Sequence, residues 1–234
     1  LGRAIETENS KYGAITNDDL KWLHKYCIGD DGFSGNISST NRRVGFLTGT
    51  YWAWKNYEKL GNPQYFGSFG YRRLLSPNFL DNIKQYDLIL PNKKDFKIES
   101  IKEQFIFYHG ERLYKNAIEI FDTIYPQETD NLRTYFNGTS GYFDEIYVIK
   151  KEIFFEFCAW IFPLLFAYLK MPQLTLKNND MRDIGFIMER LTGYYCYTLC
   201  KQPNINFMDT DIIITEKLKA NVNKDIFNKL RNHR

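Results

Sequence analysis

Residues 45–56 read Gly-Phe-Leu-Thr-Gly-Thr-Tyr-Trp-Ala-Trp-Lys-Asn, and residues 64–73 read Gln-Tyr-Phe-Gly-Ser-Phe-Gly-Tyr-Arg-Arg. The pattern predicts a helix over 48–60, capped by Thr48, and a short strand over 65–69 that ends at Gly70. The aromatic residues do not form the simple apolar face that core packing alone would need. Rings beside paired arginines suit a pocket that stacks a ring and neutralises an anion. We therefore expect the functional site in this stretch.

Strands and helices alternate along the rest of the chain. We expect further strands over 88–90, 145–149 and 212–215, and helices over 18–26, 100–124 (two helices), 151–169 and 180–200. This alternation, without a linker or an internal repeat, predicts one α/β domain over 1–234 with helices flanking a mainly parallel sheet. Ligands of such sheets bind beyond the carboxyl ends of the strands, which is where the segment 70–73 falls.

The bulk composition is that of an ordinary globular protein. The chain has 234 residues, is 44% hydrophobic and carries a net charge of +3, which is too small to argue for nucleic acid as a partner. The four cysteines show no metal-binding spacing and are expected to be buried free thiols. The most apolar run, 157–169, is too short to span a bilayer. We expect a cytoplasmic protein, with peripheral contact at the inner face of the membrane allowed.

Several polar groups could carry chemistry, and each has a structural alternative. Tyr71, Arg72 and Arg73 follow a strand and could bind a diphosphate, or form a surface ion-pair cluster. A loop before the aromatic helix could bind sugar hydroxyls, or only build Asx-turns; its polar residues are Asp30, Asp31, Asn36 and Ser38.

Two further patterns concern a catalytic base and a metal. Arg182, Gly185 and Glu189 share one helix face, where Glu189 could act as a base or form a structural pair with an arginine. Gly185 leaves room there for a ligand or for another backbone. Asp209-Thr210-Asp211 has the Asp-x-Asp form of many metal sites, but it precedes a predicted strand rather than following one, so a metal site is not favoured.

These segments together make up a recognisable pattern: a Gly-Asp loop at 29–31, Asn-Ile-Ser at 36–38, Leu-Thr-Gly-Thr-Tyr-Trp-Ala-Trp-Lys-Asn at 47–56, and Gly-Ser-Phe-Gly-Tyr-Arg-Arg at 67–73. The pattern resembles a bacterial glycosyltransferase family of capsular-polysaccharide and O-antigen loci, formerly a domain of unknown function, which includes galactofuranosyltransferases. Further matches lie at Tyr86–Pro91, His109, Tyr125–Pro126, Lys150–Glu152, Trp160–Pro163 and Arg182–Leu191.

The resemblance implies a GT-A-like fold, a UDP-sugar donor and a glycan or lipid-linked glycan acceptor, with inverting transfer of a hexose such as galactofuranose. It also implies a first strand before residue 1. In this reading arginines replace the metal of related enzymes, so no cofactor is expected, and Mn²⁺ or Mg²⁺ is allowed but not favoured. Glu189 is the first candidate base and Asp144 the second. The donor would contact Asp30, Asp31, Asn36, Ser38, Thr48, Trp52, Trp54, Tyr71, Arg72, Arg73 and Arg182.

The chain departs from the family pattern at three places in the expected site. Gly70 replaces a His, Phe46 replaces a Glu, and Glu145 replaces an Asn. These departures keep a second function open, an inactive transferase-like module that only binds within a capsule assembly complex. The tail over 216–234 carries six Lys or Arg residues and two acidic ones. It predicts a basic amphipathic helix for either an anionic membrane surface or packing on the domain or a partner subunit.

Overall fold

The structure is a computed structural model that describes residues 35–70, 73–174 and 181–214. Its α-helices are α1 (Asn41–Val44), α2 (Leu47–Lys55), α3 (Ile101–His109), α4 (Glu111–Ile124), α5 (Thr129–Asn137), α6 (Lys151–Leu169) and α7 (Asp183–Leu199). The 3-10 helices are η1 (Ser38–Thr40), η2 (Tyr57–Leu60), η3 (Pro77–Gln85) and η4 (Pro126–Glu128). The strands are β1 (Tyr65–Ser68), β2 (Arg73–Leu75), β3 (Leu88–Pro91), β4 (Lys94–Asp95), β5 (Ser140–Gly141), β6 (Tyr147–Lys150), β7 (Phe207–Thr210) and β8 (Ile212–Ile214).

The main sheet is mixed rather than mainly parallel. Its strand order is β1-β6-β3-β7, in which β3 and β7 are parallel and the other two pairings are antiparallel. The expected α/β architecture is therefore present, while the expected strand direction holds for one pairing of the described sheet. The alternation of strands and helices along the chain did not determine the strand directions. β6 follows a loop, lies between β1 and β3, and runs antiparallel to both.

The sheet has an apolar layer on each face. Tyr147 and Ile149 of β6 join the large core beneath the helices, while Val148 of β6 and the preceding Ile146 join a smaller core with Phe79 of η3. This follows from the two-residue period of a strand, since neighbouring side chains point to opposite faces. β6 is therefore covered on both sides, as a central strand should be.

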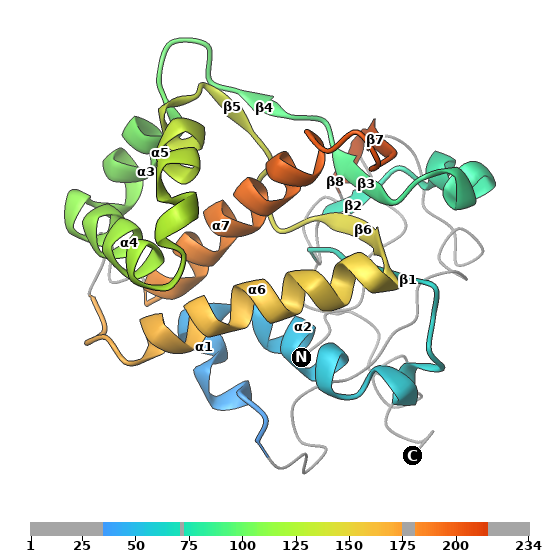
Figure 1. Cartoon of the computed structure of the whole chain (residues 1–234), viewed down its shortest axis with the longest axis horizontal. Helices are drawn as coiled ribbons and strands as arrows, with labels where there is room; N and C mark the ends of the chain where they lie inside the picture. Colours follow the sequence, from blue (N-terminus) through green and yellow to red (C-terminus); the bar gives the residue numbers. More distant parts are fainter. Residues whose placement is uncertain (1–34, 71–72, 175–180, 215–234) are drawn as a thin grey trace, which may run out of the picture.

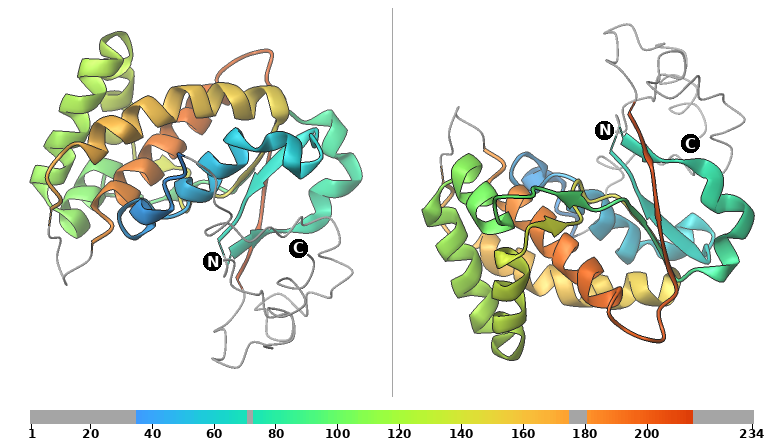
Figure 2. Two further views of the ribbon diagram at one scale, coloured as in Figure 1. Left: turned by 90° about the horizontal axis from the view of Figure 1, so that it is seen from below. Right: turned by 90° about the horizontal axis from the view of Figure 1, so that it is seen from above.

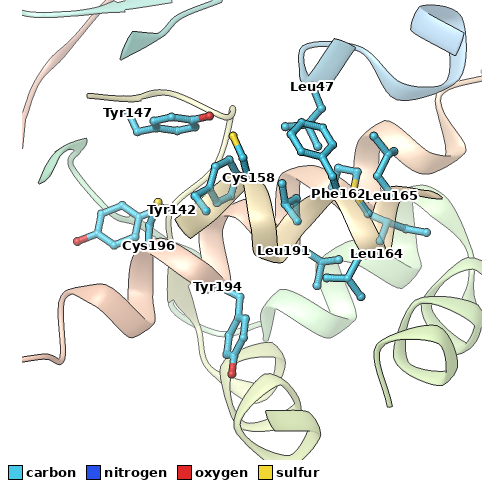
Figure 3. Close-up of a cluster of buried hydrophobic side chains, with 14 of the residues drawn as sticks. Leu47, Tyr142, Tyr147, Cys158, Phe162, Leu164, Leu165, Leu191, Tyr194 and Cys196 are labelled. Atoms are coloured by element: carbon cyan, nitrogen blue, oxygen red, sulfur yellow. The ribbon is translucent and has the colours of Figure 1, made fainter. Parts of the chain in front are cut away.

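α6 and α7 form the centre of the larger core. They cross the molecule side by side, with α1 and α2 on one side and the helices α3, α4 and α5 grouped at the end away from the main sheet (Figures 1 and 2). Side chains from α2, α6 and α7, among them Leu47, Phe162 and Leu191, meet in this core (Figure 3). α6 is long and apolar enough to cross a membrane by length and composition. Here α6 packs against α2, α4 and α7, and this position in the core explains its apolar composition.

Most of the predicted helices and strands that fall within the described residues are present, but the helix predicted over 48–60 divides at Asn56 into α2 and η2. α6 spans the predicted residues, whereas α5 was not predicted at all. Thr48 is not the N-cap of α2: Phe46 holds that position, and the Thr48 hydroxyl donates to the carbonyl of Gly45, 2.9 Å away. The first residue of the helix predicted over 180–200 and the helices predicted over 18–26 and 216–234 lie outside the described residues. Of the cysteines that the structure describes, Cys158 and Cys196 are buried and free, as expected, while Cys200 is free but only partly buried.

Candidate functional site

Two cations converge on one carboxylate beside the main sheet. The guanidinium of Arg73, the first residue of β2, pairs with Oδ1 of Asp144, and the Lys94 ammonium lies 2.5 Å from Oδ2. Arg73 and Lys94 have about half of their side-chain surface exposed, whereas the Asp144 side chain is only 12% exposed. The carboxylate thus lies inside, with two accessible cations at its rim. Such a pair of cations can also bind an anionic ligand.

The chain at Asp144 has an unusual backbone. Asp144 and Glu145 both have positive φ angles, 71° and 52°, a conformation that residues other than glycine rarely adopt. It costs about 1–3 kcal/mol per residue and tends to occur at functional sites. Asn tolerates it better than Glu does, so the departure from the family pattern at 145 falls on a demanding position. The turn aims the Asp144 carboxylate at Arg73 and Lys94.

Glu189 of α7 holds this turn by a hydrogen bond to its backbone. Its Oε1 accepts a hydrogen bond from the backbone N–H of Asp144 at 2.7 Å, and its Oε2 pairs with Arg190 at 3.0 Å. Arg190 is itself buried, lies over the ring of Phe143 at 4.5 Å and donates to Gln104 at 2.8 Å. Both oxygens of Glu189 are therefore engaged by the protein.

Glu145 is a buried carboxyl next to this network. The residue is 6% exposed, and its Oε1 has no hydrogen-bond partner among the described residues. Burial raises the pKa of Glu145 well above its ordinary value, and the nearby charges of Glu189 and Asp144 raise it further, while Arg182 opposes them. Burial therefore favours the protonated form of Glu145 over the charged form.

The other two departures from the family pattern adjoin each other. The Phe46 ring would lie 3.7 Å from a Cβ atom at position 70, so a side chain longer than alanine there would extend toward that ring. Gly70 also forms a β-bridge with Arg73. All three departures therefore lie around Arg73 and Asp144, in the part of the molecule where the sequence predicts donor binding.

The α7 face that carries Gly185 is occupied by backbone rather than open to a ligand. A Cβ at Gly185 would lie 3.1 Å from the carbonyl oxygen of Val44, which belongs to α1. Arg43 of α1 pairs with Asp183 at 2.9 Å and holds this contact together. Of the two alternatives for Gly185, the close approach of a backbone is the one observed. Arg182 is the N-cap residue of α7, at the same end of the helix.

The two described rings of the predicted aromatic pocket, Trp52 and Trp54, pack elsewhere than around Arg73. Trp52 is 2% exposed in the core, and Trp54 stacks on Phe162 of α6 at 5.3 Å. Thr48 is buried in the first turn of α2. The helical period that gathers these residues turns them toward α6. Asn36 accepts a hydrogen bond from the Ser38 backbone N–H, the Asx-turn alternative. Asp30, Asp31, Tyr71 and Arg72 lie outside the described residues.

The Asp-x-Asp motif precedes β8, as predicted, and it also ends β7, a strand that the sequence pattern did not predict. Asp209 and Thr210 close β7, beside the end of β3. Asp209 accepts a hydrogen bond from the Tyr142 hydroxyl at 3.1 Å, and Asp211 accepts one from Asn92 at 2.8 Å. Burial raises the pKa of Asp209. Within 35–70, 73–174 and 181–214, no three His, Cys, Asp or Glu side chains group as metal ligands. Metal dependence stays a prediction, since Asp30 and Asp31 are not described.

Sequence reasoning missed Lys94. Its signal was nevertheless present: Lys93 and Lys94 follow the buried strand β3 almost directly, at the carboxyl end where ligands of α/β proteins bind. Lys93 lies over the ring of Tyr142 at 5.3 Å.

Both the fold and the sequence of this chain are similar to those of known proteins. The structure is similar to that of a glycosyltransferase, the WbbM bifunctional glycosyltransferase in its apo form, with a TM-score of 0.69, 24% identity, and coverage of 82% of this chain and 40% of that one. The likeness concerns the fold. The model of the domain of unknown function DUF4422 matches residues 11–202, so the protein belongs to that family. A comparison with curated proteins finds no match.

Proposed function

We propose that the protein is a glycosyltransferase that moves a sugar from a UDP-sugar donor to a glycan acceptor. The observation that carries this proposal is the convergence of Arg73 and Lys94 on Asp144 beside the main sheet. A departing nucleoside diphosphate gains negative charge, and two accessible cations at one point can stabilise it. The glycosyltransferase fold of the neighbouring structure supports the same class of reaction.

In this proposal the donor diphosphate competes with Asp144 for the two cations. Without a donor, Asp144 neutralises Arg73 and Lys94. When the diphosphate binds, its oxygens take over the hydrogen bonds of Arg73 and Lys94. The Asp144 carboxylate is then released from both pairs, and its oxygens are open to the acceptor hydroxyl. Donor binding thereby prepares the base.

The chemical step is a displacement at the anomeric carbon. The bond from that carbon to the diphosphate oxygen breaks, a bond to the acceptor oxygen forms, and the acceptor hydroxyl proton passes to the base. Of the two candidates, the contacts favour Asp144. Its partners Arg73 and Lys94 are accessible, so the diphosphate can take them over, whereas Glu189 is held by a backbone N–H and by the buried Arg190. Glu189 then acts as a positioning residue for Asp144.

The finer assignments are proposals that follow from the family resemblance. They are a galactofuranose-type donor, inverting stereochemistry, no required metal, and synthesis of capsular polysaccharide or O-antigen at the cytoplasmic face of the membrane. The acceptor in that setting would be a glycan or lipid-linked glycan. The alternative is an inactive module that binds the donor without turning it over, which the departures at Phe46, Gly70 and Glu145 keep open.

Release of UDP tests the proposal. The full chain is incubated with a panel of UDP-sugars, with and without glycan acceptors, and free UDP and glycosylated products are followed by mass spectrometry. We expect release from one donor, and its loss in the Arg73→Ala and Lys94→Ala variants. Arg133→Ala is the matched control, because Arg133 pairs with Asp130 on the exposed face of α5. Donor binding without release from any donor would instead support the inactive module.

A further inference from the structure

A pocket of about 650 Å³ lies at the opposite end of the β1–β6 ladder from Arg73 and Asp144. It is formed by the end of α2, η2, the loop that follows and the first turns of α6. The ladder pairs Ser68 with Tyr147 near the candidate site and Tyr65 with Lys150 near this pocket. The volume lies within the range of sites for small ligands. The proposed transfer reaction makes no use of this pocket.

Aromatic contacts fix the walls of the pocket. The Tyr57 ring stacks on Phe154 at 5.3 Å, meets the edge of Phe155 at 5.1 Å, and its hydroxyl donates to the Pro63 carbonyl at 2.9 Å. Trp54 is held against Phe162 at 5.3 Å. These rings are therefore already ordered before any ligand arrives, which lowers the entropic cost of binding. Phe155 is 36% exposed and offers apolar surface to a ligand.

Three lysines line this pocket without a described carboxylate as an ion-pair partner. Lys55 lies over the Trp54 ring at 3.6 Å, Lys151 donates to Asn62 at 3.1 Å, and Lys59 is exposed at the rim. Two carboxylates, Glu58 and Glu152, also line it and can accept hydrogen bonds from hydroxyl groups. The lysines outnumber the acids by one. The lining therefore suits a ligand that carries both hydroxyls and a negative charge.

We propose that this pocket binds an anionic saccharide, a sugar unit that carries a carboxylate or a phosphate, remote from the reaction centre. A flat nucleobase is a poorer fit, because Phe162 and Lys55 already contact the Trp54 ring and Phe154 stacks on the Tyr57 ring. The pocket would hold part of a glycan chain while its end is extended elsewhere on the protein. The inference rests on the proposed function only for the origin of that saccharide.

Direct binding measurements test the pocket without any turnover. Calorimetry on the full chain uses three probes: a hyaluronan tetrasaccharide as the anionic saccharide, chitotetraose as a neutral one, and inorganic phosphate. The test variant is Lys59→Gln with Lys151→Gln. The matched control is Lys84→Gln with Lys115→Gln, which removes two exposed lysines from η3 and α4. Arg73→Ala reports on the reaction centre.

We expect the wild type to bind the anionic tetrasaccharide more tightly than the neutral one. The Lys59/Lys151 variant should bind the anionic tetrasaccharide at least about fivefold more weakly than the wild type, the Lys84/Lys115 control or Arg73→Ala does. Equal affinity in all variants, loss of binding only in Arg73→Ala, or phosphate binding as tightly as the tetrasaccharide would each overturn the assignment. Absence of transferase activity with intact probe binding would count against the proposed function and leave this pocket assigned.

Discussion

The backbone N–H of Asp144 donates to the Glu189 carboxylate over 2.7 Å, which ties the turn before β6 to the middle of α7. The carboxylate of the same Asp144 holds Arg73 and Lys94. One residue thus links the rigid core helix to the accessible cations at the rim. The two carboxyl groups that sequence reasoning ranked as alternative bases are therefore parts of one arrangement, and their variants should behave differently.

The first prediction concerns the two cations. Arg73→Ala and Lys94→Ala should each weaken UDP binding by about 1.5–3 kcal/mol, because each removes a charged hydrogen bond to the diphosphate. Isothermal calorimetry on folded protein measures this loss. Arg133→Ala, which removes an exposed arginine with a pair of its own, should bind like the wild type. Unchanged affinity in both Arg73 and Lys94 variants would remove the diphosphate from this position.

The second prediction separates the base from its support. Asp144→Asn should lower turnover by about 10²-fold or more while UDP binding holds or tightens, because the amide cannot take a proton and competes less for Arg73 and Lys94. Glu189→Gln should lower turnover less, since its amide oxygen can still accept from the Asp144 N–H. Steady-state kinetics and calorimetry on both variants make the comparison. A larger loss of turnover in Glu189→Gln, with donor binding intact, would make Glu189 the base.

The third prediction uses the raised pKa of Glu145. Above about pH 4.5 the unfolded chain loses this proton and the folded chain keeps it, so Glu145 makes stability fall as pH rises toward its folded pKa. Glu145→Gln removes that dependence and keeps a similar shape. The variant should therefore gain stability relative to the wild type between pH 5 and pH 8, as measured by urea unfolding at both values. A constant difference at the two pH values would mean that Glu145 is not buried as a neutral acid.

Local signals predicted the elements of this fold better than their arrangement. The helix over 151–169 and the strand over 65–69 follow from apolar composition and from the glycine and proline residues around them. Strand direction depends on contacts between distant residues, and β6 runs antiparallel to β3 only because the loop after α5 brings it in from the other side. α5 carries few apolar residues, so its pattern was weak.

The candidate site was also predictable only in part, because the sequence shows residue types and local patterns but not contacts between distant residues. Arg73, Asp144 and Glu189 were named from their residue types and neighbouring elements, and they do meet. The pairing of Lys94 with Asp144, 50 residues away, has no local signature. Trp52 and Trp54 are the opposite case: their residue types fit a ring pocket, but the turn of α2 directs Trp52 into the core and Trp54 against α6.

The fourth prediction concerns two glycines of α7. A Cβ at Gly193 would lie 2.2 Å from the backbone oxygen of Tyr142, whereas one at Gly185 would lie 3.1 Å from that of Val44. Overpacking of a core costs about 1–3 kcal/mol, and a collision with backbone leaves little room for relief. Gly193→Ala should therefore lower the free energy of unfolding by more than Gly185→Ala does. Urea midpoints that rank the two variants in the other order would contradict the packing of β5 and its following loop on α7.

The last prediction concerns metal. If Arg73 and Lys94 neutralise the diphosphate, activity should survive a chelator, and Asp209→Asn with Asp211→Asn should stay active. Both aspartates already accept hydrogen bonds, from Tyr142 and from Asn92, and the asparagine amide oxygens can keep those contacts. Transfer is measured in EDTA and again after addition of Mn²⁺ or Mg²⁺, and a urea midpoint checks that the double variant is folded. If transfer strictly requires the metal and the double variant is inactive even when metal is added, the Asp-x-Asp motif is the metal ligand, and Arg73 and Lys94 are auxiliary charges. If transfer strictly requires the metal and the double variant remains active with metal added, the ligands are to be sought at Asp30 and Asp31.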